Sequence, residues 1–201
     1  MAATFLPRPA PARSAARRRL GPALRALALL GAALPALAAA VPALAAPEAT
    51  GPVTRLPLPR YVSLKTDRVN LREGPSKDHR TSWVFQRAGL PVEIVGEFET
   101  WRRIRDSEGT EGWVLHSLLS GRRTALVTPV AKGNGTPIPL RDRADEGAGV
   151  LARLQAGVIA SVKQCSGAWC RVIVVMPNAR DLDGYIRQER LWGVYPDERV
   201  E

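Results

Sequence analysis

The sequence predicts an all-β protein in which two small barrels in tandem follow an N-terminal export segment. Short strand-like runs separated by turn residues occupy the chain after residue 60, and no amphipathic helix of useful length follows residue 46. A set of landmark residues in the first of these regions also returns in the second. Short strands with turn signals between them are typical of barrels and sandwiches rather than of parallel β-α-β units.

A pattern of about 70 residues occurs twice along the chain. The first copy consists of residues 69–76, 88–95, 101–105 and 111–114, and the second of residues 138–142, 156–162, 169–172 and 183–186. The offset between equivalent positions is 69 for Leu71 and Leu140, 68 for Trp101 and Trp169, and 72 for Gly112 and Gly184. This period exceeds that of short solenoid repeats, so we infer the duplication of a whole domain.

The first copy combines four recognisable runs. They are Asn-Leu-Arg-Glu-Gly-Pro at 70–75, an Ala-Gly strand from Ala88, a Trp-x-x-Ile strand from Trp101 and a Gly-Trp-Val strand at 112–114, with a short helical turn expected from His116. In this order, the runs resemble the bacterial SH3 (SH3b) domain.

The second copy resembles the same family less closely. It lacks the Gly-Pro pair after Leu140, and Tyr185 stands where the first copy has Trp113. The resemblance implies two SH3-like barrels that act as a binding or scaffolding module of the bacterial envelope, a role often associated with peptidoglycan or cell-wall enzymes. It does not supply a ligand.

The N-terminal residues have the layout of a secretory signal. Six arginines and no acid lie in residues 1–46, followed within this segment by an apolar run from Ala26 and by small residues before Pro47. This order predicts cleavage near Ala45 and a periplasmic or secreted mature chain, by either the general or the twin-arginine route. The alternative is an uncleaved membrane anchor of about 20 residues, which the alanines and prolines disfavour.

Removal of the export segment changes what the charge implies. The formal net charge of the whole chain is +10, and it falls to +4 without these six arginines. A charge of this size gives no reason to expect a nucleic-acid partner. No later segment is apolar enough to span a bilayer, so stable membrane insertion after cleavage is not expected.

Composition and turn signals divide the chain into four segments. They are a signal peptide at 1–45, a Pro-rich linker at 46–60, a first SH3b-like domain at 61–131 and a second at 132–201. The linker is expected to be extended because it contains four prolines and has no periodicity. The junction around residue 132 is short, which suggests that the two barrels pack against each other.

Three tryptophans and one arginine are candidate ligand-binding residues of the first copy. Trp83, Trp101 and Trp113 belong either to the core or to a shallow groove that stacks on a sugar ring or an extended peptide. For Trp113 we favour the core, and for Trp83 and Trp101 both interpretations stand. Arg103 adds positive charge beside them, although interleaved acids make ion pairs across the hairpin the simpler role of such arginines.

The chain contains two cysteines, Cys165 and Cys170, which align with Glu97 and Arg102 of the first copy. If the residues between them form a hairpin loop, the two cysteines face each other and a disulfide is geometrically reasonable. One bond is also the simplest use of two cysteines in an exported chain. A redox pair favours Cys-x-x-Cys and a zinc site needs four ligands, so neither a metal nor a cofactor is expected.

No catalytic constellation is recognised. Both cysteines have a structural use, and paired carboxylates such as Glu97 and Glu111 have no deep cleft predicted around them. We therefore predict a non-enzymatic binding or scaffolding protein of the envelope, with peptidoglycan or a periplasmic protein as partner. The alternative is a cell-wall hydrolase or a regulator of one, and the oligomeric state stays open.

Overall fold

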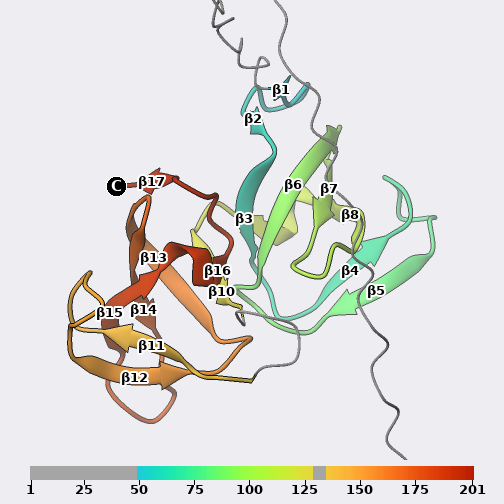
Figure 1. Cartoon of the computed structure of the whole chain (residues 1–201). Helices are drawn as coiled ribbons and strands as arrows, with labels where there is room; N and C mark the ends of the chain where they lie inside the picture. The colour runs from blue at the N-terminus through green and yellow to red at the C-terminus, as the bar shows by residue number, and fades with distance from the viewer. Residues whose placement is uncertain (1–48, 129–134) are drawn as a thin grey trace, which may run out of the picture. The chain divides into compact units, whose positions relative to one another are not determined.

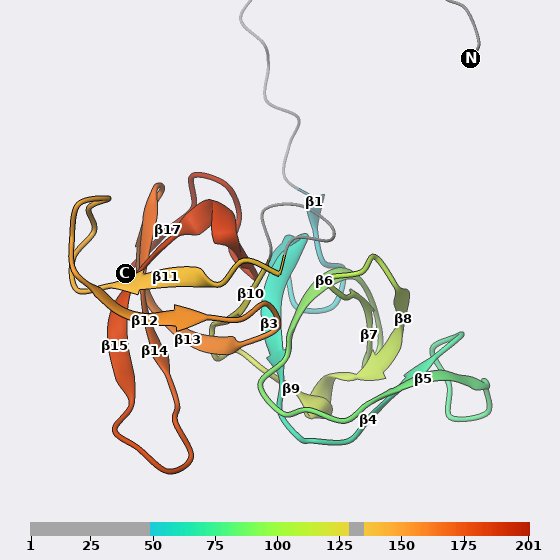
Figure 2. The same cartoon turned by 60° about the horizontal axis from the view of Figure 1, so that its bottom comes forward.

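The computed structural model describes residues 49–128 and 135–201, which belong to one compact unit, Ala45–Glu201. Within these residues there is no α-helix, and two main sheets are present, one for each repeat (Figure 1). Both views show each sheet curving back on itself (Figures 1 and 2). The prediction of an all-β fold with two small barrels is confirmed. No helix in the described part of the chain is long and apolar enough to cross a membrane.

The first barrel is a seven-stranded antiparallel sheet with the order β5-β4-β8-β7-β6-β3-β9. Its elements are β3 (Arg60–Leu64), β4 (Val69–Arg72), β5 (Thr81–Phe85), β6 (Pro91–Phe98), β7 (Trp101–Arg105), β8 (Glu111–Leu115), the 3-10 helix η1 (His116–Leu118) and β9 (Leu119–Ser120). In β4, Val69 and Leu71 are buried while Asn70 is exposed, because successive side chains of a strand point to opposite faces.

The second barrel repeats this arrangement with the order β12-β11-β15-β14-β13-β10-β16. Its elements are β10 (Thr124–Val127), β11 (Ile138–Arg141), β12 (Val150–Leu154), β13 (Ile159–Ser166), β14 (Trp169–Val174), β15 (Leu182–Arg187), the 3-10 helix η2 (Gln188–Arg190), β16 (Leu191–Trp192) and β17 (Arg199–Val200). Strand β17 pairs with β13 beside the main order.

The sheet topology moves the boundary between the barrels. A first domain at 61–131 and a second at 132–201 would assign β10 to the first barrel, yet β10 pairs with β13 and β16 of the second sheet. It takes the place that β3 has in the first sheet, between β6 and β9. The second barrel therefore begins at Thr124. The sequence placed β10 wrongly because it is separated from the rest of its repeat by the turn cluster at 132–136.

The two barrels share their register. Phe98 pairs with Trp101 across the hairpin of β6 and β7, and the strand register shifts between Ile94 and Gly96. The equivalent hairpin of β13 and β14 has the same shift, between Val162 and Gln164. A bulge at the same position in both copies supports the duplication that the sequence predicted.

The position before the aromatic residue in β8 and in β15 requires glycine, and the physical reason is the same in both barrels. A Cβ on Gly112 would lie 2.8 Å from the carbonyl oxygen of Arg72. A Cβ on Gly184 would lie 2.7 Å from the carbonyl oxygen of Arg141. Only glycine permits this approach between the two strands, so the Gly-aromatic landmark and the Leu-Arg landmark specify one contact.

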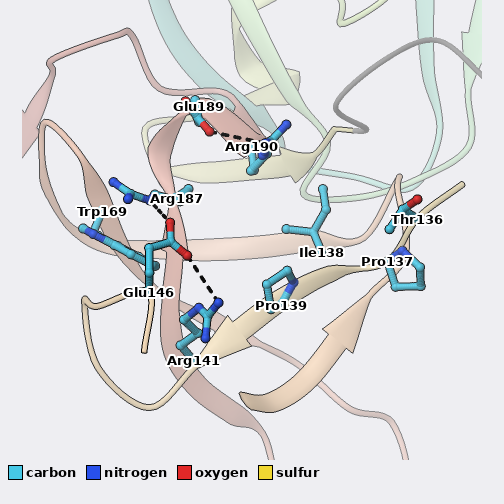
Figure 3. A pocket seen from close by; sticks show the side chains of 10 residues that line it. All are labelled: Thr136, Pro137, Ile138, Pro139, Arg141, Glu146, Trp169, Arg187, Glu189 and Arg190. Carbon is cyan, nitrogen blue, oxygen red and sulfur yellow. Dashed lines mark hydrogen bonds and ion pairs between the residues drawn. The ribbon is translucent and has the colours of Figure 1, made fainter. Parts of the chain in front are cut away.

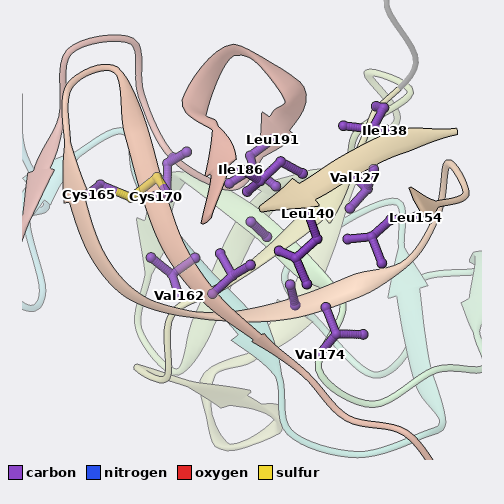
Figure 4. Packing of buried hydrophobic residues seen from close by; sticks show 14 residues of the cluster. Val127, Ile138, Leu140, Leu154, Val162, Cys165, Cys170, Val174, Ile186 and Leu191 are labelled. Atoms are coloured by element: carbon purple, nitrogen blue, oxygen red, sulfur yellow. A yellow bond between two sulfur atoms is a disulfide. The ribbon is translucent and has the colours of Figure 1, made fainter. Parts of the chain in front are cut away.

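Each barrel encloses its own hydrophobic core. The buried residues of the first core are Leu64, Val69, Leu71, Phe85, Val92, Ile94, Ile104 and Val114. Those of the second include Val127, Ile138, Leu140, Leu154, Ala160, Val162, Val172, Val174, Ile186 and Leu191, together with the two cysteines (Figure 4). The apolar residues that define the repeat are thus the ones that stabilise it by burial.

The predicted disulfide is present. Cys165 and Cys170 are bonded to each other across the ladder of β13 and β14, with their Cα atoms 4.1 Å apart. The bond lies at the edge of the second core (Figure 4). At the equivalent positions of the first barrel, Glu97 and Arg102 pair across β6 and β7, and the Nε of Arg102 lies 3.5 Å from a Glu97 oxygen.

The barrels also contact each other through polar and aromatic groups. The hydroxyl of Tyr195 donates to a Glu93 carboxylate oxygen over 2.8 Å, and the Tyr61 ring lies 5.1 Å from Trp192 and 4.6 Å from Tyr195 between centroids. Burial and the Glu93 carboxylate raise the pKa of Tyr61 to about 12. The two barrels therefore pack against each other as expected, although the segment that joins them ends at Thr124 and not near residue 132.

Part of the predicted linker is ordered. Residues 46–60 were expected to be extended, but β1 (Ala49–Thr50) and β2 (Pro57–Leu58) form a small antiparallel ribbon. The turn between them donates to the buried carboxylate of Glu97 from the backbone N of Val53 (3.1 Å) and of Thr54 (2.9 Å). Arg60 adds a further bond from Nη2 over 2.8 Å. Composition missed this ribbon because its partner lies about 40 residues away.

The same contacts control the ionisation of Glu97. Burial alone would raise the pKa of this carboxyl, but the hydrogen bonds from Thr54, Arg60 and Val53 outweigh burial and lower it to about 2. Because the pKa is lower in the folded chain than its ordinary value of 4.5, ionised Glu97 stabilises the fold above that value. This stabilisation is lost as the pH falls toward 2.

We expect Glu97→Gln to lower the free energy of unfolding by about 1–3 kcal/mol, since buried donors lose a charged acceptor. Urea unfolding of the variant and wild type, measured between pH 7 and pH 2, tests this. The difference in the free energy of unfolding between the variant and the wild type should be full above about pH 4.5 and shrink below it.

Trypsin should also cleave the Glu97→Gln variant faster than the wild type after Arg55 in the ribbon turn. Glu108→Gln, on an exposed turn, is the control, and equal stability of both variants at neutral pH would contradict the account.

Candidate binding grooves

A groove opens on the first barrel between β4, the loop that follows it, the start of β7 and the end of β8. Seven residues line it, and we call it groove 1: Arg68, Asn70, Arg72, Lys77, Trp101, Leu115 and Leu118. The register places Trp101 at the first position after the hairpin turn, opposite Leu115. The loop and the barrel therefore both contribute to its wall.

The second barrel has a groove at the same place, which we call groove 2. Its lining residues are Thr136, Pro137, Ile138, Pro139, Arg141, Glu146, Trp169, Arg187, Glu189 and Arg190 (Figure 3). All seven lining positions of groove 1 recur among them, at the offsets that relate the repeats. The duplication has therefore preserved a surface feature as well as a core.

An arginine shapes the loop beside each groove. Arg72 donates from Nη1 to the carbonyl oxygens of Lys77 (2.9 Å) and His79 (2.7 Å). Arg141, its counterpart, donates from Nη1 to the carbonyl oxygen of Ala148 (2.8 Å). Ala148 is equivalent to His79, so the Leu-Arg landmark fixes the same loop in both barrels. One side of each guanidinium is occupied in this way.

Groove 1 is cationic. Arg68, Arg72 and Lys77 line it, and no acid does. None of these three side chains takes part in an ion pair within the residues that the structure describes. Trp101, Leu115 and Leu118 supply the apolar part. The groove thus offers positive charge beside an apolar wall.

Groove 2 pairs its arginines with acids of its own. Glu146 accepts a hydrogen bond from Arg187 Nε over 2.6 Å and one from Arg141 Nη2 over 3.2 Å (Figure 3). The guanidinium of Arg187 also lies 4.5 Å from the centre of the Trp169 ring, a distance at which a cation is attracted to the ring face. The hydrogen bond from Arg187 is the main reason that the pKa of Glu146 is lowered.

The structure separates the four residues proposed for ligand binding. Trp101 is 7% exposed and forms part of the wall of groove 1. Trp83 is 58% exposed on the edge strand β5, where it lines a different depression with Phe85. Trp113 and Arg103 pair across β7 and β8, and Arg103 forms an ion pair with Glu111 at 2.8 Å. A ligand-binding role for these residues stays a prediction, and they do not form one site.

Sequence reasoning overlooked most of the residues that line the grooves. Arg68 and Lys77 of groove 1, and Glu146 and Arg187 of groove 2, were not singled out. Aligning the two copies through the loop after the Leu-Arg landmark would have shown Lys77 opposite Glu146. In residues 49–128 and 135–201, no group of three or more His, Cys, Asp or Glu side chains could hold a metal ion.

The described part of the chain thus consists of two tandem barrels, each with a groove at the same place. The family model described as "Bacterial SH3 domain" matches residues 65–121 and 134–193, which together make up more than half of the chain. The protein therefore belongs to the bacterial SH3 domain family and contains two copies of the domain.

The solved structures that match the chain include two from Trichomonas vaginalis. The structure of NlpC2 is 14% identical with a TM-score of 0.29, covering 67% of this chain and 48% of that one. The structure of NlpC1 is 14% identical with a TM-score of 0.29, covering 66% of this chain and 45% of that one. The present chain thus spans about half the length of either. No curated protein matches the chain.

We expect Trp101→Ala and Trp83→Ala to differ sharply in stability. Truncating the buried Trp101 should cost about 3–5 kcal/mol because a large cavity forms. Truncating the exposed Trp83 should change the free energy of unfolding by less than about 0.5 kcal/mol. Thermal and urea unfolding followed by circular dichroism test this. An equally large loss of stability for Trp83→Ala would contradict the exposed position of Trp83 on β5.

Proposed function

We propose that this protein is a non-enzymatic, exported binding module of the bacterial envelope, which binds peptidoglycan or a periplasmic protein partner. The observation that carries the proposal is the recurrence of one groove at the same position of both barrels. Each groove has a tryptophan and an arginine in its lining. An indole gives a flat apolar surface and a guanidinium gives directed donors, a pair suited to extended polar ligands.

Peptidoglycan offers the chemistry that such grooves accept. Its glycan strands present sugar rings that pack against aromatic side chains, and its peptides carry carboxylates. Groove 1 combines three cations with an apolar wall. Membership of the bacterial SH3 family agrees with a role at the cell wall.

A periplasmic or secreted location is part of the proposal. The disulfide between Cys165 and Cys170 is suited to an oxidising compartment. The export pattern of residues 1–45, which lies outside the described residues, supplies the route. The alternative of a retained anchor concerns the same residues.

Two observations favour binding over hydrolysis. A general acid must hold a proton near the working pH, whereas the pKa of Glu97 is about 2 and its carboxylate is enclosed by the N-terminal ribbon. The other suggested carboxylate, Glu111, forms an ion pair with Arg103. These two groups are therefore poor candidates for the acid and base of a glycosidase.

Sedimentation with purified peptidoglycan tests the proposal, using the chain without residues 1–45. We expect the protein to pellet with the wall material and to release no soluble muropeptides. Supernatant protein in the absence of peptidoglycan is the control for aggregation. Failure to sediment, together with no envelope protein recovered by crosslinking, would contradict the proposed function, and release of muropeptides would identify a hydrolase instead.

A further inference from the structure

The two grooves carry different charges at several equivalent positions. Glu146 of groove 2 stands where groove 1 has Lys77, and Arg187 stands where groove 1 has Leu115. A carboxylate in one repeat is thus replaced by an ammonium group in the other. Both grooves retain the arginine that ends the strand before the loop, which is Arg72 in β4 and Arg141 in β11.

Groove 2 shows how this arginine binds a carboxylate. Arg141 uses Nη1 for the carbonyl oxygen of Ala148 and Nη2 for a carboxylate oxygen of Glu146. Glu146 also binds Arg187, which stacks on Trp169 (Figure 3). The acid of groove 2 therefore comes from the protein itself, and it joins the two arginines, of which Arg187 lies over the tryptophan ring.

Groove 1 has the same arginine without the acid. Arg72 uses Nη1 for the loop carbonyls of Lys77 and His79, and among the described residues no hydrogen bond from its Nη2 is found. Its side of the loop presents Lys77 instead of a carboxylate. Arg68 adds a third cation at the position that Pro137 occupies in groove 2.

From this comparison we propose that groove 1 binds a carboxylate of a peptidoglycan peptide at the place where groove 2 holds Glu146, and that Glu146 closes groove 2 to such ligands. The inference rests on the proposed function and names the part of the ligand that is recognised. Arg72 Nη2, Lys77 and Arg68 bind the anion, while Trp101 and Leu118 contact the apolar part of the peptide. Charge complementarity favours this occupant because the groove has cations and no acid.

The first test exchanges the charge of groove 1. The probe is a fluorescently labelled muropeptide, released from peptidoglycan by a muramidase, and binding to the chain without residues 1–45 is followed by anisotropy. We expect Lys77→Glu to weaken binding about tenfold or more, because it places an acid where groove 2 has Glu146. Arg68→Glu should act in the same direction. Lys163→Glu, the same charge change on an exposed residue of the other barrel, should bind as the wild type does.

The second test opens groove 2. Glu146→Lys removes the internal acid and frees Arg141 and Arg187, so the number of muropeptides bound per chain should rise from one to two in calorimetric titrations. A muropeptide whose carboxyl groups have been amidated has no carboxylate to offer, so it should bind the wild type at least about tenfold more weakly.

Failure of the inference can be distinguished from failure of the proposed function on which it rests. Unchanged affinity of folded Lys77→Glu and Arg68→Glu, or equally tight binding of the amidated probe, would overturn the inference while peptidoglycan binding survived. Stronger competition by inorganic phosphate than by acetate would also overturn it, in favour of a phosphate-bearing wall polymer. No binding of intact peptidoglycan by the wild type would instead remove the proposed partner itself. Circular dichroism confirms that each variant is folded.

Discussion

The register of three adjacent antiparallel strands determines the rest of each barrel. In β6, β7 and β8, and again in β13, β14 and β15, the same positions pair and the same bulge precedes the hairpin turn. This register places a tryptophan directly after the turn, at the wall of a groove. It also brings an arginine within reach of an acid that lies diagonally on the neighbouring strand, so that Arg103 forms an ion pair with Glu111 and Arg171 with Asp183. A shift of one residue would turn every side chain to the opposite face.

Within this shared register, the two barrels stabilise one hairpin position by different chemistry. The first uses buried Glu97, bound by arginines and by the N-terminal ribbon, and the second uses the disulfide of Cys165 and Cys170. A terminal segment covers the position in both cases, since β17 pairs with Cys165. The electrostatic version depends on pH and on its ribbon, whereas the covalent version depends on an oxidising environment. One chain therefore stabilises the same hairpin position in two different ways.

Sequence reasoning was most successful where the physical cause is local or repeated. The strand periods, the Gly112 and Gly184 landmarks and the pairing of the cysteines followed from spacing alone, because each reflects a contact within one hairpin or between neighbouring strands. It was wrong where the cause is distant: β10 belongs to a sheet whose other strands lie beyond the turn cluster, and the ribbon of β1 and β2 is held by Glu97 of the first barrel. The grooves were missed because their character depends on which charges meet in space. Only the structure shows that Glu146 is already bound to two arginines, while Lys77 forms no ion pair within the part of the chain that the structure describes.

The claim that groove 1 binds a muropeptide while Glu146 closes groove 2 is tested most directly by nuclear magnetic resonance. The chain has five tryptophans, and each indole N–H gives its own signal. On addition of soluble muropeptide to the chain without residues 1–45, the account predicts that the Trp101 signal shifts and saturates while the Trp169 signal stays in place. A shift of Trp169 or Trp83 with Trp101 unmoved would contradict it.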